Sequence, residues 1–321
     1  MYRDHRIGVV IPAYKEEQLI GATLEGIPEY IDTIYVIDDG SPDRTGAIAQ
    51  EHAQKDSRIV YLRHARNSGV GAAIRTGYNR SSEDQMDISV VMAGDNQMDP
   101  HFLPSLLDPI IDEGIDYSKG NRLYNKESRK GMSAWRTFGN FVLTYLTKLA
   151  SGYWFLVDPQ NGYTALSRHV SATTTFDFLY PGYGYCNVLL AWLNINDFTV
   201  KDVPIPARYG NETSGIRYHS YIPRLTSLLL RCFGWRINNK YLKSGHLTIG
   251  LCYILGIAFL FAGFSLFAIE AIGILLVGMP WYFLWLVSFA IGMMGALFFI
   301  SGVALEIKTY HAQIQQNAGQ V

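Results

Sequence analysis

A polar turn rich in oxygen-bearing side chains follows an apolar run at residues 88–92. The run predicts a buried strand, and Asp95, Gln97 and Asp99 come soon after it. Their carboxylate and amide oxygens are the hard donors that Mg²⁺ or Mn²⁺ prefers, so the turn is a candidate site for a divalent ion that carries a diphosphate. The same residues also fit an ordinary turn into a helix, with Asp99 as N-cap and Pro100 as the first helical residue.

Polar turns also follow two earlier predicted strands. The β-branched runs at residues 6–12 and 33–37 lead into turns at residues 14–17 and 38–43. In an open α/β sheet, ligands bind outside the carboxyl ends of the strands, so we expect the three turns to meet at one edge. An isolated Asp-Asp-Gly-Ser at residues 38–41 is more typical of helix capping, but the recurrence of polar turns at successive strand ends favours an active site.

The elements that position these turns alternate between strand and helix. A further strand is predicted at residues 59–62, and helical spacing of apolar residues is seen at 18–27 and 45–54. This alternation predicts an α/β fold with a mostly parallel sheet built from βαβ units. The turn at residues 67–71 lacks the Lys-Ser/Thr ending of a P-loop and the glycine spacing of a dinucleotide fingerprint, so NTP hydrolysis and hydride transfer lose support.

The composition is apolar for a soluble enzyme. Hydrophobic residues make up 49% of the 321 residues and charged residues 17%, and most of the apolar excess lies after Leu247. Cys186, Cys232 and Cys252 have no paired spacing, so a disulfide framework is not expected. The formal net charge of −1 argues neither for nor against a polyanion, and we expect no nucleic-acid partner. The polar N-terminus leads directly into a strand without a signal peptide, which predicts a cytoplasmic catalytic part.

Two long uncharged runs predict a C-terminal membrane anchor. The run Leu247–Ala268 would extend about 33 Å as a helix, enough to cross a bilayer, and Tyr282–Leu305 is a second such run. Lys240 and Lys243 precede the first run and Lys308 follows the second. Because positive flanks stay in the cytoplasm, both ends are expected there and the two runs form a transmembrane hairpin.

The segment just before the anchor carries basic residues beside an apolar helical face. Leu225, Leu228, Leu229 and Cys232 share this face, and the same segment contains Arg217, Arg224, Arg231 and Arg236. The pattern predicts an amphipathic helix in the membrane surface, and a packed terminal helix of the globular domain is the alternative. We expect a catalytic domain at 1–215, an interfacial region at 216–243, a two-helix anchor at 244–310 and a cytoplasmic tail at 311–321.

Five motifs, taken in order, resemble the family-2 glycosyltransferases, and among them the polyprenyl-phosphate glycosyltransferases such as dolichyl-phosphate mannose synthase. The resemblance covers roughly residues 6–241. The motifs are Ile11–Glu17, Ile37–Asp43, Asn67–Gly71, the turn that contains Asp95, and Asn161–Ser167. The resemblance implies a GT-A nucleotide-sugar fold for the catalytic domain, with the anchor as a variable appendage.

The resemblance also implies a role for each matching residue. The nucleotide-sugar pocket would be lined by Pro12, Tyr14, Glu16, Asp38, Asp39 and Asp95. Asp95 and Gln97 would hold Mg²⁺ or Mn²⁺ against the donor diphosphate. Arg122 and Arg136 would grip the acceptor phosphate, and Arg208 would contact a phosphate from the other side. Asp95, Arg122 and Arg136 are therefore the candidate catalytic residues, and residues 126–130 would lie in an acceptor loop.

The chain departs from the family pattern at Ala93. The metal motif of the family is commonly Asp-x-Asp-x-Gln, and Ala93 stands at its first position. The ion would then depend on Asp95, Gln97, the diphosphate and water, which Mg²⁺ often retains.

The resulting prediction is transfer of one hexose, with inversion, from GDP-mannose or UDP-glucose to a membrane polyprenyl phosphate. Two alternatives stay open. A processive polysaccharide synthase would need more membrane helices and a Gln-x-x-Arg-Trp motif, which the sequence lacks. A non-catalytic membrane homologue that binds nucleotide sugar is favoured only by Ala93 and the apolar hairpin. The base, the sugar and any homo-oligomer are not specified by these motifs.

Overall fold

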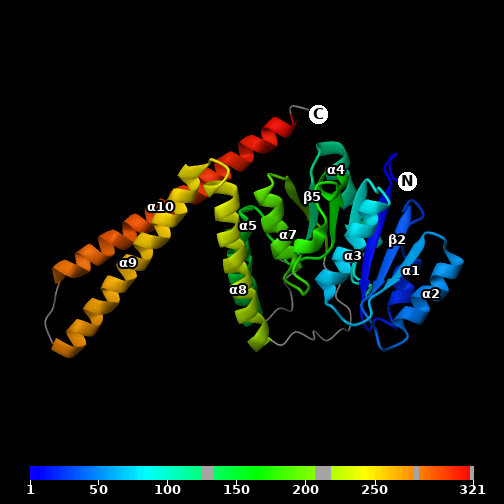
Figure 1. The fold of residues 1–321 in the computed structure, drawn as a ribbon, viewed down its shortest axis with the longest axis horizontal. Coiled ribbons are helices and arrows are strands. Elements are labelled where there is room, and N and C mark those ends of the chain that lie inside the picture. The colour runs from blue at the N-terminus through cyan, green and yellow to red at the C-terminus, as the bar shows by residue number, and fades with distance from the viewer. Residues whose placement is uncertain (125–133, 207–217, 278–281, 319–321) are drawn as a thin grey trace. The chain divides into compact units, whose positions relative to one another are not determined.

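The computed structural model describes the chain except residues 125–133, 207–217, 278–281 and 319–321. Beside these gaps, at 134–141, 218–221 and a few positions near 277–282 and 315–318, only the backbone is described. The chain divides into two compact units, Met1–Phe233 and Gly234–Gln320. The first unit contains the sheet, and the second contains the two long C-terminal helices (Figure 1).

A seven-stranded sheet forms the centre of the first unit, with the strand order β3-β2-β1-β4-β6-β5-β7. Its strands are β1 (Ile7–Ala13), β2 (Thr33–Asp38), β3 (Ile59–Arg63), β4 (Ile88–Val91), β5 (Tyr117–Asn121), β6 (Thr164–Ser167) and β7 (Val200–Pro204). Only the pairings of β6, with β4 and with β5, are antiparallel. The predicted α/β fold with a mostly parallel sheet is confirmed.

Helices cover both faces of this sheet (Figure 1). Among them, α3 (Val70–Glu83) packs on β1 and β2, and α4 (Leu103–Glu113) packs on β5 and β6. The other helices up to residue 236 are α1 (Ile20–Glu25), α2 (Thr45–Lys55), α5 (Ala134–Ser151), α6 (Arg168–Ser171), α7 (Tyr185–Ile195) and α8 (Tyr218–Arg236), with the 3₁₀ turns η1 (Pro100–Phe102) and η3 (Phe176–Phe178). Val9 and Ile11 of β1 join one core with apolar residues of α1 and α4. Val10 faces α3 instead, where Gly77 leaves room for it. The alternation of side chains along β1 thus buries both faces, as expected for a central strand.

The register of the sheet brings the polar turns to one edge. Ala13 pairs with Asp38, and Asp38 pairs with Arg63, so β1, β2 and β3 end together. The turn after β4 lies beside the end of β1, because the Gly94 amide donates to the Pro12 carbonyl over 3.3 Å. Two antiparallel pairings through β6 make β5 parallel to β4. The carboxyl end of β5, followed by Arg122, therefore lies at this same edge.

The strand order reverses between β1 and β4. After β1 the chain adds β2 and β3 on one side, and it then returns to add β4 on the other. Such a switch point creates the crevice in which open α/β sheets bind ligands. It lies between the turn that contains Tyr14 and the turn that contains Asp95.

The second unit consists of α9 (Leu247–Val277) and α10 (Tyr282–Ala318), preceded by a short π-helical segment, η4 (Ile237–Leu242). The two long helices lie side by side as a hairpin (Figure 1), and Gly263 packs directly on the backbone of Gly292. Both are long and apolar enough to cross a membrane. In their most apolar windows only 17% and 11% of the residues are buried, unlike the core helices of a water-soluble protein.

Helix α8 differs from the sequence-based expectation in the face that it exposes. Of the predicted lipid-facing residues, Leu225, Leu229 and Cys232 are each at most 5% exposed. Leu228 is partly exposed. The exposed apolar residues of α8 are instead Ile222 and Leu230. Most of the apolar stripe is therefore packed inside the protein, and the interfacial region at 216–243 stays a prediction in which Ile222 and Leu230 would face the membrane surface.

Candidate active site at the carboxyl edge of the sheet

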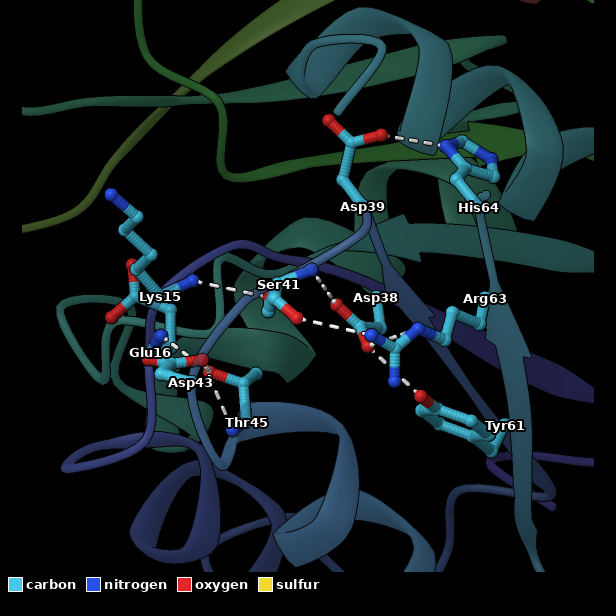
Figure 2. A network of polar contacts seen from close by, with 10 residues as sticks. All are labelled: Lys15, Glu16, Asp38, Asp39, Ser41, Asp43, Thr45, Tyr61, Arg63 and His64. Carbon is cyan, nitrogen blue, oxygen red and sulfur yellow. Dashed lines mark hydrogen bonds and ion pairs between the residues drawn. The ribbon is translucent and has the colours of Figure 1, made fainter. Parts of the chain in front are cut away.

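Asp38, at the end of β2, is fully buried and bonded to its own neighbourhood (Figure 2). Its Oδ1 accepts a hydrogen bond from the Ser41 amide at 2.8 Å, and its Oδ2 accepts one from the Tyr61 hydroxyl at 2.9 Å. The Arg63 Nε lies 3.5 Å from the same Oδ2. Buried carboxylates need such partners, and these contacts lock the turn after β2 onto β3.

Asp39 organises the next turn along the edge. The His64 Nδ1 lies 2.6 Å from Oδ1 of Asp39 (Figure 2), and the amides of Ser68 and Gly69 donate to its two oxygens at 2.9 and 2.7 Å. Gly69 has φ +97°, a conformation that glycine adopts without strain. The His64 Nε2 is itself paired with Thr76 of α3 at 2.9 Å. Asp39 therefore fixes the turn from which α3 begins.

Four backbone amides at the start of α3 donate hydrogen bonds to oxygen atoms of the protein. The amides of Ser68 and Gly69 are bound to Asp39, and those of Gly71 and Ala72 donate to the Pro181 carbonyl at 2.7 and 3.1 Å. A phosphate-binding loop needs such amides to point at the ligand. The geometry thus agrees with the sequence-based argument against a P-loop.

The turn after β1 is tied to the turn after β2. The Lys15 amide donates to the Ser41 hydroxyl at 3.2 Å, and the Glu16 amide donates to the Thr45 hydroxyl at 2.8 Å (Figure 2). Tyr14 is 38% exposed, and the ammonium of Lys15 lies 5.4 Å from the centre of its ring. The two turns therefore form one connected rim, on which the Tyr14 ring is accessible to a ligand.

The two aspartates of the turn after β4, Asp95 and Asp99, have different surroundings. Asp99 accepts the His101 amide at 2.9 Å and caps η1, with Pro100 as the first helical residue. Asp95 accepts the Gln97 amide at 3.0 Å, and burial raises the pKa of its carboxyl above the ordinary value. A partly buried carboxylate of this kind is stabilised by a nearby cation. Asp99 thus performs the capping role foreseen for it, and Asp95 is the better ligand for a metal ion.

Arg122 follows β5 at the same edge and forms a two-point ion pair with Asp158. The Nε and Nη2 atoms of Arg122 lie 2.8 and 3.3 Å from the two oxygens of Asp158. The Asp158 side chain is only 4% exposed, whereas that of Arg122 is 43% exposed. The cation is therefore held in one orientation at the surface by a buried anion.

A group of polar and charged side chains next to the Arg122–Asp158 pair was not recognised from the sequence. It comprises the buried Lys119 and Asp158, the buried amides Asn121 and Asn161, and the partly buried Asp202. Asp202 accepts the Val157 amide at 2.7 Å, and burial raises the pKa of its carboxyl to about 6. The signals available in the sequence were a lysine and an aspartate at corresponding positions within two short strands, Lys119 in β5 and Asp202 in β7.

Two of the predicted phosphate-binding arginines lie beyond the described side chains. Arg208 falls in the undescribed segment 207–217, and Arg136 belongs to α5, where only the backbone is described. Their proximity to Arg122 is therefore a prediction from the sequence alone.

A depression of about 410 Å³ lies at the end of β3, against the start of α3. Arginine and histidine dominate its lining, which includes Arg63, His64, Arg66 and Arg75. His64 forms part of this wall and is bound to Asp39 on its other side. The depression thus adds positive charge beside the turn that Asp39 organises, which suits an anionic ligand.

The residues present fit a divalent ion shared with a ligand, rather than one enclosed by protein. Within the described ranges no cluster of three or more His, Cys, Asp or Glu side chains could hold a metal ion. Asp95 supplies one partly buried carboxylate and Gln97 an amide from the same turn. Mg²⁺ is often held by one or two carboxylates together with phosphate oxygens and water, so this donor set suffices for a metal–diphosphate complex.

Comparison with known proteins assigns the sequence of this chain to a family. The sequence pattern described as Glycosyl transferase family 2 matches residues 8–172, just over half of the chain. The chain belongs to this family. The matched region contains the turns of Asp39, Asp95 and Arg122, so every side chain described at the edge, apart from Asp202, comes from the segment that defines the family.

The names of two relatives refer to dolichyl phosphate or to a polyprenol monophosphate sugar. The UDP-N-acetylglucosamine--dolichyl-phosphate N-acetylglucosaminyltransferase of Methanococcus voltae is 29% identical over 64% of this chain and 87% of its own length. The polyprenol monophosphomannose synthase of Mycolicibacterium smegmatis is 32% identical over 61% of this chain and 75% of its own length.

Solved structures support the same fold. The glucosyl-3-phosphoglycerate synthase of Mycobacterium tuberculosis, in complex with Mg²⁺ and uridine-diphosphate, superposes with a TM-score of 0.52 at 21% identity, covering 73% of this chain and 79% of that one. The predicted GT-A fold is therefore confirmed. At this identity the likeness concerns the fold alone.

Proposed function

We propose that this family-2 glycosyltransferase transfers a hexose, with inversion, from a nucleotide sugar to the phosphate of a membrane polyprenol. The observation that carries the proposal is that Asp95 and Arg122 follow the parallel strands β4 and β5 and so lie at the same edge of the sheet. This arrangement supports a site in which Asp95 would anchor the departing diphosphate and Arg122 would bind the incoming phosphate. The names of the two relatives support a polyprenyl-phosphate acceptor.

The chemistry needs positioning and charge neutralisation more than proton transfer. An oxygen of the acceptor phosphate attacks the anomeric carbon while the bond from that carbon to the donor diphosphate breaks. The phosphate is already anionic near neutral pH, so no strong general base is required. Arg122, and Arg136 if its side chain reaches the same place, would orient the attacking phosphate through paired hydrogen bonds.

Asp95 and Gln97 would hold Mg²⁺ or Mn²⁺ at the donor diphosphate. When bound, the ion stabilises the negative charge that develops on the leaving diphosphate. The structural neighbour with Mg²⁺ and uridine-diphosphate supports this assignment at the level of the fold. The absence of a carboxylate at Ala93 leaves Asp95 as the principal protein ligand in this turn.

The nucleotide would lie in the crevice between the turns after β1 and β4. Tyr14 offers an accessible ring for the base, and Pro12 and Glu16 belong to the same rim. Asp38 and Asp39 would shape this pocket through the turns that they hold. Arg208, from the segment after β7, would reach a phosphate of the donor.

The hairpin of α9 and α10 would anchor the enzyme in the membrane that contains its acceptor. A long polyprenyl tail stays in the bilayer, so an enzyme that uses its phosphate must work at the surface. Lys240, Lys243 and Lys308 flank the apolar runs, which supports a cytoplasmic catalytic domain. The catalytic domain 1–215, the interfacial region 216–243, the anchor 244–310 and the tail 311–321 are the parts we propose.

The direct test supplies membranes that contain the full chain with Mg²⁺, a polyprenyl phosphate and one radiolabelled donor at a time. GDP-mannose, UDP-glucose and UDP-N-acetylglucosamine are the donors to compare, and label in the lipid phase is the expected result for one of them. Label that requires the protein but appears only in free sugar would contradict the acceptor assignment. No turnover of any donor, despite donor binding, would favour the non-catalytic alternative.

A further inference from the structure

We infer that Asp158 is a positioning residue that sets the orientation in which Arg122 meets the acceptor phosphate. This inference rests on the proposed function, because it concerns the use of Arg122 in acceptor binding. Asp158 faces Arg122 from inside the protein and is only 4% exposed. It therefore acts through Arg122 rather than on the acceptor itself.

The contacts between the two residues fix both the backbone and the side chain of Arg122. The Arg122 amide donates to Oδ2 of Asp158 at 3.2 Å, in addition to the Nε bond at 2.8 Å and the Nη2 bond at 3.3 Å. A carboxylate that receives Nε and Nη2 together sets the plane of the guanidinium. The plane is thus chosen before any acceptor arrives, which lowers the entropy lost on binding.

The loop that carries Asp158 is bound to the neighbouring strands through the residues on either side of it. Asp202 of β7 accepts the amide of Val157, the preceding residue, at 2.7 Å. Asn161 donates from its side chain to the Gly120 carbonyl of β5 at 2.8 Å, and its own carbonyl accepts the ammonium of buried Lys119. The loop from Val157 to Asn161 is therefore bound to both β5 and β7.

This support explains why Arg122 keeps its orientation although almost half of its side chain is exposed. If Arg122 turned away, the buried charge of Asp158 would lose its ion-pair partner, and an unpaired buried charge is strongly disfavoured. The paired Arg122 side chain is still 43% exposed, so its positive charge reaches the surface while the ion pair with Asp158 is intact. Asp158 thus holds the cation in place and leaves it accessible.

The chain contains a matched control for the chemistry of this pair. Arg58 and Asp56 also form a two-point ion pair, with Nε 3.0 Å and Nη2 2.7 Å from the Asp56 oxygens. They precede β3, at the amino end of the parallel strands and therefore at the opposite edge of the sheet. Asp56→Asn breaks a similar pair without approaching the proposed acceptor site.

The test measures transfer kinetics for the full chain, with donor binding and thermal unfolding recorded in parallel. For Asp158→Asn we expect KM for polyprenyl phosphate to rise at least about tenfold, kcat to change less than about threefold and donor affinity to stay unchanged. Asp56→Asn should leave KM unchanged. In an Arg122→Ala background, Asp158→Asn should add less than about twofold to KM, because both changes remove one interaction.

The outcomes separate the inference from the proposed function. A wild-type chain that transfers sugar, with Asp158→Asn unchanged in KM or additive with Arg122→Ala, overturns the positioning role alone. A fall in Tm and kcat at unchanged KM also overturns it, because a purely structural role predicts that pattern. A wild-type chain that gives no transfer to polyprenyl phosphate removes the proposed function, and the inference with it.

Discussion

Arg236 and Glu306 form an ion pair that is buried almost completely, with exposed side-chain fractions of 0% and 3%. The hydroxyls of Tyr241 and Tyr253 also donate to Glu306, the latter at 2.6 Å. The guanidinium lies over both tyrosine rings, within 6 Å of their centres at 5.8 and 5.9 Å. Burial alone would lower the pKa of Arg236, but attraction to Glu306 raises it above the ordinary value. The pair joins the end of α8 to α10.

Removal of one partner of this pair should destabilise the second unit strongly. Arg236→Ala leaves the Glu306 carboxylate buried without its cation, which typically costs about 3–5 kcal/mol. We expect a clear fall in Tm, measured by thermal unfolding of the full chain in detergent micelles. The double variant Arg236→Met/Glu306→Leu removes both charges and should recover most of the loss. Arg224→Ala, at an exposed position on α8, is the control and should leave Tm unchanged. An Arg236→Ala chain with wild-type Tm would show that the pair contributes nothing.

The two acids of the turn after β4 should respond differently to substitution. Asp95→Ala removes the principal metal ligand, so we expect transfer to fall at least about 100-fold and its dependence on Mg²⁺ concentration to weaken. Asp99→Ala, four residues away, removes a helix cap and should cost about 1 kcal/mol of stability with transfer retained. Transfer assays over a Mg²⁺ titration, with Tm for each variant, make the comparison. If the Asp95→Ala chain transferred sugar as fast as the wild-type chain, the metal assignment would be refuted.

Asp202 predicts a defined pH dependence of stability. Burial raises the pKa of its carboxyl from 3.8 to about 6, so the folded chain binds this proton more tightly than the unfolded chain does. The stabilisation from this proton is fully present below about pH 4 and is lost as the pH rises through about 6, a change of about 3 kcal/mol for such a shift. Asp202→Asn can still accept the Val157 amide and carries no charge. The difference in Tm between this variant and the wild type should therefore change between pH 4 and 7, and parallel profiles would contradict the prediction.

Asp39 should matter for the order of the turn that leads into α3. Asp39→Asn replaces one carboxylate oxygen with a donor, so the amide of Ser68 or of Gly69 loses its acceptor. We expect a loss of about 1–3 kcal/mol, the usual cost of an unsatisfied buried polar group, together with weaker donor binding. Hydrogen exchange at these two amides and Tm provide the measurement. His64→Gln removes one of the partners only and should have a smaller effect, and unchanged exchange in Asp39→Asn would argue against the contacts.

Local patterns in the sequence were sufficient for the class of fold and for the arrangement of the polar turns along one edge of the sheet. Strands such as β1 and β4 are recognisable because short runs rich in β-branched residues bury both faces of a central strand. Parallel strands must deliver their carboxyl ends to one edge, so the turns of Asp39 and Asp95 could be assigned to one site before any contact was known. The apolar runs of α9 and α10 were equally clear, since length and lack of charge alone distinguish them.

The partners of individual side chains were decided by the tertiary structure. Asp39 and Asp95 belong to similar polar turns, yet Asp39 bonds to the turn before α3 and Asp95 is left beside the crevice. Asp158 and Arg122 lie far apart in the chain, as do Arg236 and Glu306, and no local periodicity links them. The apolar stripe of α8 looks alike in sequence whether it meets lipid or protein. A sequence pattern indicates which residues of one helix or strand are buried. Two charged side chains that are distant in the sequence form an ion pair only when strand register and helix packing bring their elements together.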